Sequence, residues 1–478
     1  MVVTTSPEVA LAQLTLLTKK LDQKKASIEK YERYYEGIHN LRFATRKFRE
    51  AFGALFREFS DNYCGLVVDV AVERMNIEGF RMPVAAQQGE GEGEHGESLA
   101  DKDAWEIWQR NNLDLYADIA HEQAFIAGES YLIVGPGEGE KGEEEPIITV
   151  EHPLEVTTVN VPGSMSRRRA AVKRWWDEDT GLFNATLYLP DSIWKFQSNK
   201  KSKTGNTSGI RWEERLGVPP VIANPFEGIV PVVPLINRQR LRGGGRSELQ
   251  EVIPLQDVIN KTYNDALVAS EFAAFRQRVL TGMEVPEDEN GNIIPDFDLK
   301  ASVQRIMLIK DKDVGVHEFQ VGDLGQYVAL LVHTRNEIAV VTRTPPQYLV
   351  GQIINVSGDA LKAGESGLVS KVKRRSKFFG EGWEEAMRLA FRLKKDARAE
   401  SFEAETIWSN PEITTESAMA DSLAKYATLG VPAQALWERL GASQNEIARW
   451  QQMIEENPLT LAPQALAALL NASGKLGE

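Results

Sequence analysis

Long stretches with a helical pattern of apolar residues dominate the middle of the chain. Segments 247–279 and 323–342 are amphipathic, and 357–394 is a third helical run. At about 1.5 Å per residue the first would span roughly 50 Å, enough to cross a whole domain. Helices of that length predict a rod with two arms and a compact insert between them, rather than the wall of a small-molecule pocket.

Local signals mark the ends and irregularities of these runs. Ser247 and Gln250 form a capping-box pattern before the first run, and Pro254 inside it predicts a kink. Asp323 is the expected N-cap of the second run, whose apolar stripe includes Val328. The third run is interrupted by glycines, each of which weakens a helix, so it is expected to bend or to pack closely against another backbone. These glycines are Gly364, Gly367, Gly380 and Gly382.

Before the long runs, helical patterns give way to alternating ones. Helices are expected at 6–37, 60–76, 99–111 and 115–127. Period-two alternation then predicts strands at 131–134, 147–150, 155–159, 170–175, 183–189, 193–197 and 228–238. These strands predict an antiparallel meander against the N-terminal helices. With a strand at 402–408 and three short helices from 415 to 456, the expected fold class is α+β and mainly helical.

Composition narrows the setting without identifying a ligand. The 478 residues exceed one hydrophobic core, so two or more structural regions are expected. The single cysteine, Cys64, excludes an intrachain disulfide framework and lies in an apolar pattern that predicts a buried thiol. No run approaches the ~20 apolar residues of a membrane span, and the N-terminus does not resemble a signal peptide. The net charge of −14 lacks the basic footprint of a protein that grips DNA broadly.

No pattern in the sequence predicts a catalytic, cofactor-binding or metal site. Gly135–Gly142 lacks the Gly-Lys-Ser/Thr order of a phosphate loop, and its glutamates would repel a phosphate. Gly243–Arg246 precedes a helix, where anions can bind, but a hinge is the favoured interpretation. The six histidines show no metal-ligand spacing, and no nucleophile elbow occurs. The expectation is therefore a protein that is not an enzyme.

A basic cluster lies on the third run. Lys371, Arg374 and Arg375 are expected to share one helix face and to form a band of positive charge with their neighbours. A solvated or inter-subunit face is the favoured interpretation. Contact with a phosphate backbone, without readout of bases, is the alternative.

Several short sequences, spread over nearly the whole chain, carry a family resemblance. They are Tyr34–Gly37, Asn62–Phe80, Trp108–Asp114, Gly128–Tyr131, Pro231–Arg238, Ser247–Asn260, Ala274–Arg278, Ser357–Glu365, Gly430–Pro432 and Leu440–Ile447. No single piece is diagnostic, but their order and spacing are fairly specific. Together they resemble the portal proteins of tailed bacteriophages, specifically the SPP1-type (Gp6-like) portal family.

The resemblance implies the parts of a portal. The implied parts are a wing at 1–245, a first stem helix at 246–281, a clip at 282–322, a second stem helix at 323–344, a tunnel loop at 345–356, a long kinked wing helix with its return strand at 357–411, a crown at 412–457 and a tail without predicted order at 458–478.

The resemblance also implies a location and partners. The chain would form a dodecameric ring at the portal vertex of the capsid, in the virion and, during assembly, in the host cytoplasm. Viral DNA would be packaged and ejected through this head–tail connector, while a separate motor supplies the force. The implied partners are the terminase large subunit, the head–tail adaptor, the major capsid and scaffolding proteins, and double-stranded DNA that passes non-specifically. No membrane and no cofactor are implied.

Two groups of residues receive roles from the resemblance. The tunnel loop would face DNA through Gln347, Val350, Gln352, Ile354 and Asn355. This loop is largely apolar and uncharged, which suits weak adhesion, because each neutralised phosphate would add drag and salt dependence. The clip would dock the motor and the adaptor. Its residues include Glu287, Asp288, Asn290, Asp296 and Arg305.

Two alternative functions come from other classes. A DNA-packaging ATPase would need a Walker lysine and an acidic catalytic pair, and the sequence contains neither pattern. Another ring-forming virion part, such as a baseplate or connector component, is the second alternative. The helix–insert–helix pattern favours the portal, since it supplies both a channel wall and an external docking knob.

Overall fold

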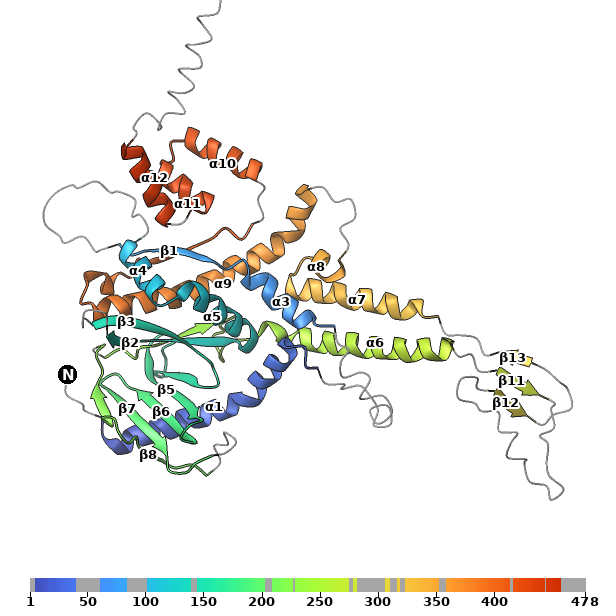
Figure 1. Cartoon of the computed structure of the whole chain (residues 1–478), viewed down its shortest axis with the longest axis horizontal. Coiled ribbons are helices and arrows are strands. Elements are labelled where there is room, and N and C mark those ends of the chain that lie inside the picture. The colour runs from blue at the N-terminus through green and yellow to red at the C-terminus, as the bar shows by residue number, and fades with distance from the viewer. Residues whose placement is uncertain are drawn as a thin grey trace, which may run out of the picture. The chain divides into compact units, whose positions relative to one another are not determined.

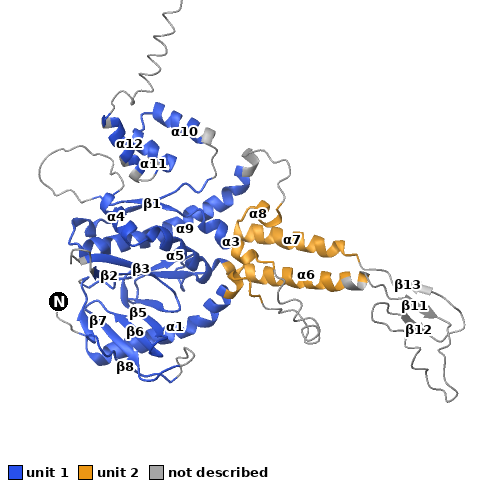
Figure 2. Ribbon diagram, in the orientation of Figure 1, with its two compact units in different colours: residues 1–32, 68–248, 356–478 blue, residues 33–67, 249–355 orange. Residues whose placement is uncertain are grey.

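The computed structural model divides into two compact units (Figures 1 and 2). Unit 1 comprises residues 1–32, 68–248 and 356–478, and unit 2 comprises residues 33–67 and 249–355. The structure describes residues 5–39, 61–83, 101–138, 144–202, 209–226, 228–274, 278–281, 306–309, 316–318, 323–351, 358–412, 416–442 and 444–456.

One layer of unit 1 is an antiparallel sheet covered by a long helix. The sheet has the order β4-β5-β6-β7-β8, and β9 also pairs with β7. The bounds are β4 Val156–Asn160, β5 Arg168–Asp177, β6 Leu182–Tyr188, β7 Ser192–Ser198, β8 Trp212–Glu214 and β9 Val221–Ala223. The helix is α1, Pro7–Tyr35, whose Leu14, Leu17 and Leu21 pack against Val172, Leu187 and Trp194 of the sheet. This arrangement confirms the predicted meander against an N-terminal helix.

A second sheet of unit 1 has the order β10-β2-β3. Its strands are β2 Glu129–Glu138, β3 Glu144–Glu151 and β10 Val232–Ile236. Tyr131 and Ile133 of β2 pack with Val156 of the first sheet. Two helices contact this second sheet, α5 Leu113–Ala127 and α9 Gly358–Leu393. Unit 1 is thus built from two packed sheets with helices against each of them.

The interface between α5 and α9 is rich in aromatic side chains. His121 of α5 stacks on Phe379 of α9 with 5.1 Å between ring centroids, and Trp108 of α4 (Lys102–Arg110) meets Trp383 edge-on at 4.9 Å. Close packing explains one helical glycine, because a Cβ at Gly382 would lie 2.5 Å from Leu235 Cδ2. The expectation of tight packing at the glycines of this run is confirmed there.

The remaining elements of unit 1 are short. Strands β1 (Ile77–Arg81) and β14 (Glu405–Trp408) pair antiparallel, and the 3-10 helix η3 (Ala397–Glu400) precedes β14. The helices α10 Glu416–Thr428, α11 Ala433–Leu440 and α12 Gln444–Glu456 follow. These are the three short helices that the sequence predicts. The helices and strands of the described residues together confirm an α+β, mainly helical fold.

Unit 2 is built on two helices that lie side by side (Figure 1). They are α6, Val252–Ala274, and α7, Gly325–Thr342, and a five-residue helix α8, Pro346–Val350, follows α7. Between the two helices in sequence is a small sheet with the order β12-β11-β13. Its strands are β11 Arg278–Thr281, β12 Ile306–Ile309 and β13 Val316–Glu318. The helix α3, Tyr63–Val72, links the units in sequence and buries Cys64, as expected.

Three local predictions are corrected. The 3-10 turn η1, Glu248–Gln250, precedes α6, so Pro254 lies in the first turn of α6, where its missing N–H removes no helical hydrogen bond, rather than at an interior kink. Residues 346–350 form α8 where a loop was expected. Residues 278–281 form the strand β11, where the first helical run was expected to continue to 279. At Gly245 a Cβ would lie 1.8 Å from the carbonyl oxygen of Gly128, so close packing requires glycine there, and the hinge stays a prediction.

Candidate functional site

A buried polar network fixes the start of α6 within unit 2. Gln256 accepts a hydrogen bond from the backbone N–H of Tyr63 at 2.9 Å and donates to the carbonyl of Asp61 at 2.6 Å. The next residue, Asp257, accepts a hydrogen bond from the Tyr34 hydroxyl at 2.6 Å. Buried polar groups that find partners in this way specify one arrangement, since a misplaced partner would leave them unsatisfied. The network therefore holds the first turns of α6 in one position against residues 34–63.

A second set of contacts joins α6 to α7. Arg335 of α7 donates to the Tyr263 hydroxyl and forms an ion pair with Asp61 at 3.3 Å. Its guanidinium also lies 5.4 Å from the ring centroid of Tyr63 and 5.8 Å from that of Tyr263. Planar stacking and ion pairing together are geometries that arginine satisfies and lysine does not. The two long helices are thus joined by a specific polar contact near their shared base.

The outer surface of α7 is unusually apolar. Leu331 and Ile338 are buried, whereas Val340, nine residues or two and a half turns after Leu331, lies on the opposite side and is 79% exposed. Val341 is also exposed, and Val328, which the sequence placed in the buried stripe, is 61% exposed. A contiguous exposed apolar surface of this kind marks a candidate interaction face.

The sheet of β11, β12 and β13 lies between the two helices in sequence. β11 starts four residues after the end of α6, and β13 ends seven residues before the start of α7. β11 is the central strand, parallel to β12 and antiparallel to β13. β12 and β13 lie within the insert predicted at 282–322, whereas β11 lies at 278–281, among residues assigned to the first stem helix. The five residues assigned to docking, Glu287, Asp288, Asn290, Asp296 and Arg305, lie outside the described residues.

The segment assigned to a tunnel loop is described in part. Gln347 and Val350 are half-buried on α8, and Leu349 between them is buried. The helix ends at Gly351, whose φ of +68° is the left-handed conformation that glycine adopts without strain. Gln352, Ile354 and Asn355 lie outside the described residues. The structure thus brings the first two of these five residues onto one short helix.

The basic cluster of α9 does not form the single exposed face that the sequence predicted. Lys371 is only 3% exposed and Arg375 is also buried, while Arg374 is exposed. Residues 371 and 375 are one turn apart and point inward, whereas position 374 lies further around the helix. The prediction that these three residues form one exposed band of positive charge is therefore wrong. Contact with a phosphate or a neighbouring subunit stays a prediction for Arg374, the exposed member of the three.

The inward pair neutralises a buried carboxylate in unit 1. Arg375 donates to Glu248 Oε1 from Nε at 3.0 Å and from Nη2 at 2.6 Å, and Lys371 Nζ lies 3.5 Å from Glu248 Oε2. Asn237 donates a further hydrogen bond to the same carboxylate at 3.1 Å. Burial alone would raise the pKa of Glu248, but the two cations outweigh it and hold the pKa at about 2. These cations serve the fold of unit 1, a role the sequence did not reveal.

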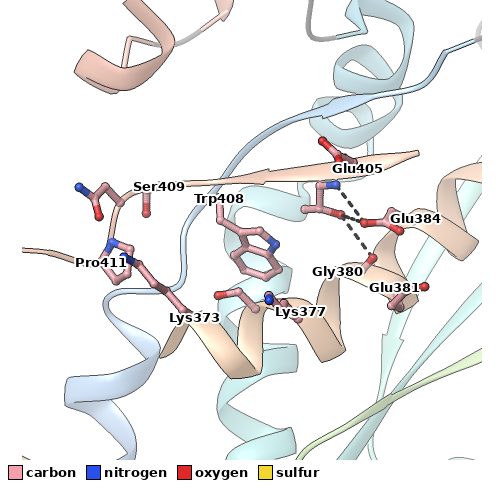
Figure 3. Close-up of a pocket in the computed structure, with 12 residues that line it drawn as sticks. Lys373, Lys377, Gly380, Glu381, Glu384, Glu405, Trp408, Ser409 and Pro411 are labelled. Atoms are coloured by element: carbon pink, nitrogen blue, oxygen red, sulfur yellow. Dashed lines mark hydrogen bonds between the residues drawn. The ribbon is translucent and has the colours of Figure 1, made fainter. Parts of the chain in front are cut away.

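A groove of about 600 Å³ lies between α9 and the segment around β14 (Figure 3). Gly380 leaves room for it, since a Cβ there would lie 3.4 Å from both Glu384 Oε1 and Trp408 Nε1. Glu384 accepts from Thr406 through its N–H at 3.0 Å and its hydroxyl at 3.2 Å. Burial raises the pKa of Glu384, opposed by the hydrogen bonds from Thr406. Hydrogen bonds between Glu384 and Thr406 thus fix one wall of the groove.

His121 is the histidine most deeply placed in the described structure, and its environment is aromatic. Trp383 Nε1 donates to His121 Nε2 at 2.9 Å, which assigns the ring proton to Nδ1. Burial lowers the pKa of His121 to about 3. His121 packs against the rings of Phe379 and Trp383 in unit 1. Among the described residues, no group of three or more potential metal ligands comes together. None of the described helices combines the length and apolarity that a membrane crossing needs.

The burial of His121 predicts acid sensitivity of unit 1. The unfolded chain binds a proton at this histidine below about pH 6.5 while the folded chain stays neutral down to about pH 3, so stability is present above pH 6.5 and falls with pH between these values. The expected slope is about 1.4 kcal/mol per pH unit. Urea unfolding at pH 7.5, 6.5 and 5.5 measures it. His121→Phe is the matched variant, and an equally steep pH profile for that variant would contradict the assignment.

The residues that sequence reasoning missed are those whose partners are distant in the chain. Glu248 pairs with residues more than 120 positions away, and only the capping-box pattern at Ser247 drew attention to its neighbourhood. The exposed face of α7 could have been predicted from the sequence, because Val340 and Val341 are apolar residues outside the stripe that packs on α6. Apolar residues on opposite sides of a helix indicate two packing surfaces, and among the described residues only the one that faces α6 is covered.

Comparison with known proteins agrees with these features. Residues 15–458 match the family model described as phage portal protein, SPP1 Gp6-like. The portal protein of Mycobacterium phage L5 is 30% identical over 411 residues, covering 82% of this chain and 78% of that protein. The portal protein of Mycobacterium phage D29 shows the same identity and coverage. Phage portal proteins are structural components of the capsid vertex. The chain therefore belongs to the SPP1 Gp6-like family of phage portal proteins.

Proposed function

We propose that twelve copies of this chain form a ring at one capsid vertex, with α6 and α7 lining a channel through which viral DNA is packaged and ejected. The observation that carries the proposal is the apolar outer face of α7. Val340 and Val341 are exposed on sides of the helix that α6 does not cover. In a ring of parallel hairpins, the next copy would cover them, so the exposed face of the single chain becomes an interior surface of the assembly.

The charges of the two helices suit a conduit that does not hold DNA. Their basic residues are Lys261 and Arg335, and both are already ion-paired, with Asp265 and Asp61 respectively. Each phosphate that a free cation neutralises would add affinity and salt dependence, and so would oppose sliding. With both cations paired inside unit 2 and a net charge of −14 on the chain, DNA is expected to pass with weak adhesion.

The sheet of β11, β12 and β13 is proposed as the docking element for the terminase large subunit and later for the head–tail adaptor. Its position between α6 and α7 in sequence supports this role, because an insert at the turn of a helical hairpin can project from the end of a rod. The contact residues proposed within it remain those of the acidic and polar stretch around 287–305. The force for DNA movement would come from the separate motor.

Deletion of residues 284–318 tests the division of labour between hairpin and insert. The deletion removes β12 and β13 but leaves α6, α7 and their polar contacts, so rings are expected to form while binding of the terminase large subunit is lost. Negative-stain images and a pull-down with the motor protein measure the two outcomes. A deletion variant that forms no rings, or that still binds the motor, would contradict the assignment.

A further inference from the structure

A second groove of unit 1, about 1000 Å³ in volume, runs along the outer edge of β10. The groove lining comes from the β4–β5 turn, from residues 239–244 after β10, and from α9. Pro234 sits in the middle of β10, and Arg168 donates to the carbonyl of Val230 beside it. Both features block the addition of another strand, since proline offers no N–H and the neighbouring carbonyl is occupied. A ligand of this groove would therefore be bound by side chains rather than by backbone pairing with β10.

The groove keeps unpaired positive charge at its rim. Arg168 forms an ion pair with Glu385, and Lys24 with Glu129, so these charges cancel locally. Arg167 and Arg240 also line the groove, and among the described residues their guanidinium groups form no hydrogen bond or ion pair. Arg388 also lines the groove, with its guanidinium over the Phe402 ring and in no ion pair among the described residues, while Glu381 adds one carboxylate. On a chain of net charge −14, this excess of arginines favours carboxylate or phosphate groups as ligands.

Apolar side chains beside these arginines favour a protein over nucleic acid. Leu241 is 91% exposed and Met165 is also exposed, and both line the groove next to Arg240 and Arg167. Methionine, arginine and exposed apolar groups together are enriched at protein–protein interfaces, whereas DNA-binding surfaces are more polar and more strongly positive. The groove therefore suits an acidic surface that also carries apolar side chains.

Such a surface exists on α5 of the same unit. Leu115, Tyr116 and Ile119 are exposed on one side of this helix. Asp114 and Asp118 lie among them one turn apart, and the Asp118 carboxylate has no hydrogen bond or ion pair among the described residues. Burial and the charge of Asp114 raise the pKa of Asp118. An arginine brought in by another molecule would relieve this like-charge contact.

We infer that the α5 face of one copy, Asp114–Ile119, docks into the β10-edge groove of the next copy, with Arg167 and Arg240 meeting Asp114 and Asp118. The inference rests on the ring assembly of the proposed function and adds a named contact to it. The two surfaces are different and complementary, so the contact is head-to-tail, the type that closes into rings rather than symmetric pairs. Leu241 and Met165 would then cover Leu115, Tyr116 and Ile119.

Charge exchange between copies tests this contact. One variant carries Arg167→Glu and Arg240→Glu, and the other carries Asp114→Lys and Asp118→Lys. Each alone would place like charges across the contact, so its ring yield in negative-stain images is expected to fall at least tenfold. Mixed in equal amounts, the two variants present matched charges at every contact of an alternating ring, and rings are expected to return. Circular dichroism checks that both variants fold. Because Asp114 also accepts hydrogen bonds from the buried Trp108 at 2.7 Å and from Gln109 at 2.8 Å, Asp118→Lys alone is made beside the double variant and is expected to lower the ring yield in the same direction.

Several results would overturn the inference while leaving the proposed function intact. Wild-type rings together with unimpaired rings from either variant would do so, as would failure of the mixture to recover. A loss of duplex-DNA binding in the arginine variant, with normal rings, would assign the groove to nucleic acid instead. If the wild-type chain forms no rings at all, the proposed function fails first. The contact is then tested by disulfide crosslinking of a Leu241→Cys chain with an Ile119→Cys chain. A crosslinked dimer is expected when the two chains are mixed and not when either is present alone, and its absence from the mixture would overturn the inference.

Discussion

Replacing Glu248 by glutamine is expected to lower the free energy of unfolding of unit 1 by about 3–5 kcal/mol, because it leaves two buried cations without their counter-ion. Lys371 and Arg375 cannot reach solvent without disturbing the packing of α9 on α5. Urea unfolding at pH 7 measures the loss. In the wild type the same contribution is present above pH 4.5 and is lost only as the pH falls toward 2, because the folded pKa of Glu248 is about 2.

Two controls separate charge burial from general damage. Lys373→Met removes a cation from the same helix whose partner, Glu412, is about half exposed, and it should change stability by less than about 1 kcal/mol. A triple variant with Glu248→Met, Lys371→Met and Arg375→Leu should recover part of the lost stability, since no buried charge is left unpaired. A Glu248→Gln protein as stable as the Lys373→Met control would show that the buried ion pairs do not form.

Val340→Asp is expected to abolish ring assembly while leaving the single chain folded. The side chain is 79% exposed in the isolated chain, so the substitution should change its stability by less than about 0.5 kcal/mol. In the ring, however, the new carboxylate would be buried against an apolar neighbour without a partner, at a cost of several kcal/mol at every contact. Native mass spectrometry counts the assembled copies, and circular dichroism reports on the fold.

Val340→Ile is the matched control, because it keeps the apolar character and adds one methylene at the same position. Rings are expected for this variant at the wild-type yield. If Val340→Asp assembles as well as Val340→Ile, the outer face of α7 is not covered by another copy, and the packing of hairpins proposed for the channel is wrong.

The sequence predicted the elements of this chain well where local pattern decides them. The strands from β2 to β7, the three C-terminal helices and the helix–insert–helix order follow from periodicity and turn residues. The prediction failed where distant partners decide. Two further errors are local: Pro254 appeared to lie inside a helix because the turn at Glu248–Gln250 has the same pattern as α6, and residues 346–350 form a helix within the segment that the resemblance assigned to a tunnel loop.

The charged residues show the same limit. Lys371 and Arg375 belong to a basic run that normally indicates a solvated face, and only the position of Glu248, brought beside α9 by the fold, turns them inward. The apolar residues Val340 and Val341 are the reverse case, because they are exposed in the described structure and the proposed ring assigns their partner to another copy. Sequence periodicity indicates that a side chain needs a packing partner. It does not indicate which element, or which copy of the chain, supplies that partner.

An electron cryo-microscopy map of the assembled particle tests the central claim most directly. The account predicts a ring in which α6 and α7 of successive copies surround an open hole wide enough for a DNA duplex, with the β11–β13 sheet outside the hole. A particle without a central opening, or one whose opening is formed by unit 1 while α6 and α7 lie at its outer rim, would contradict it.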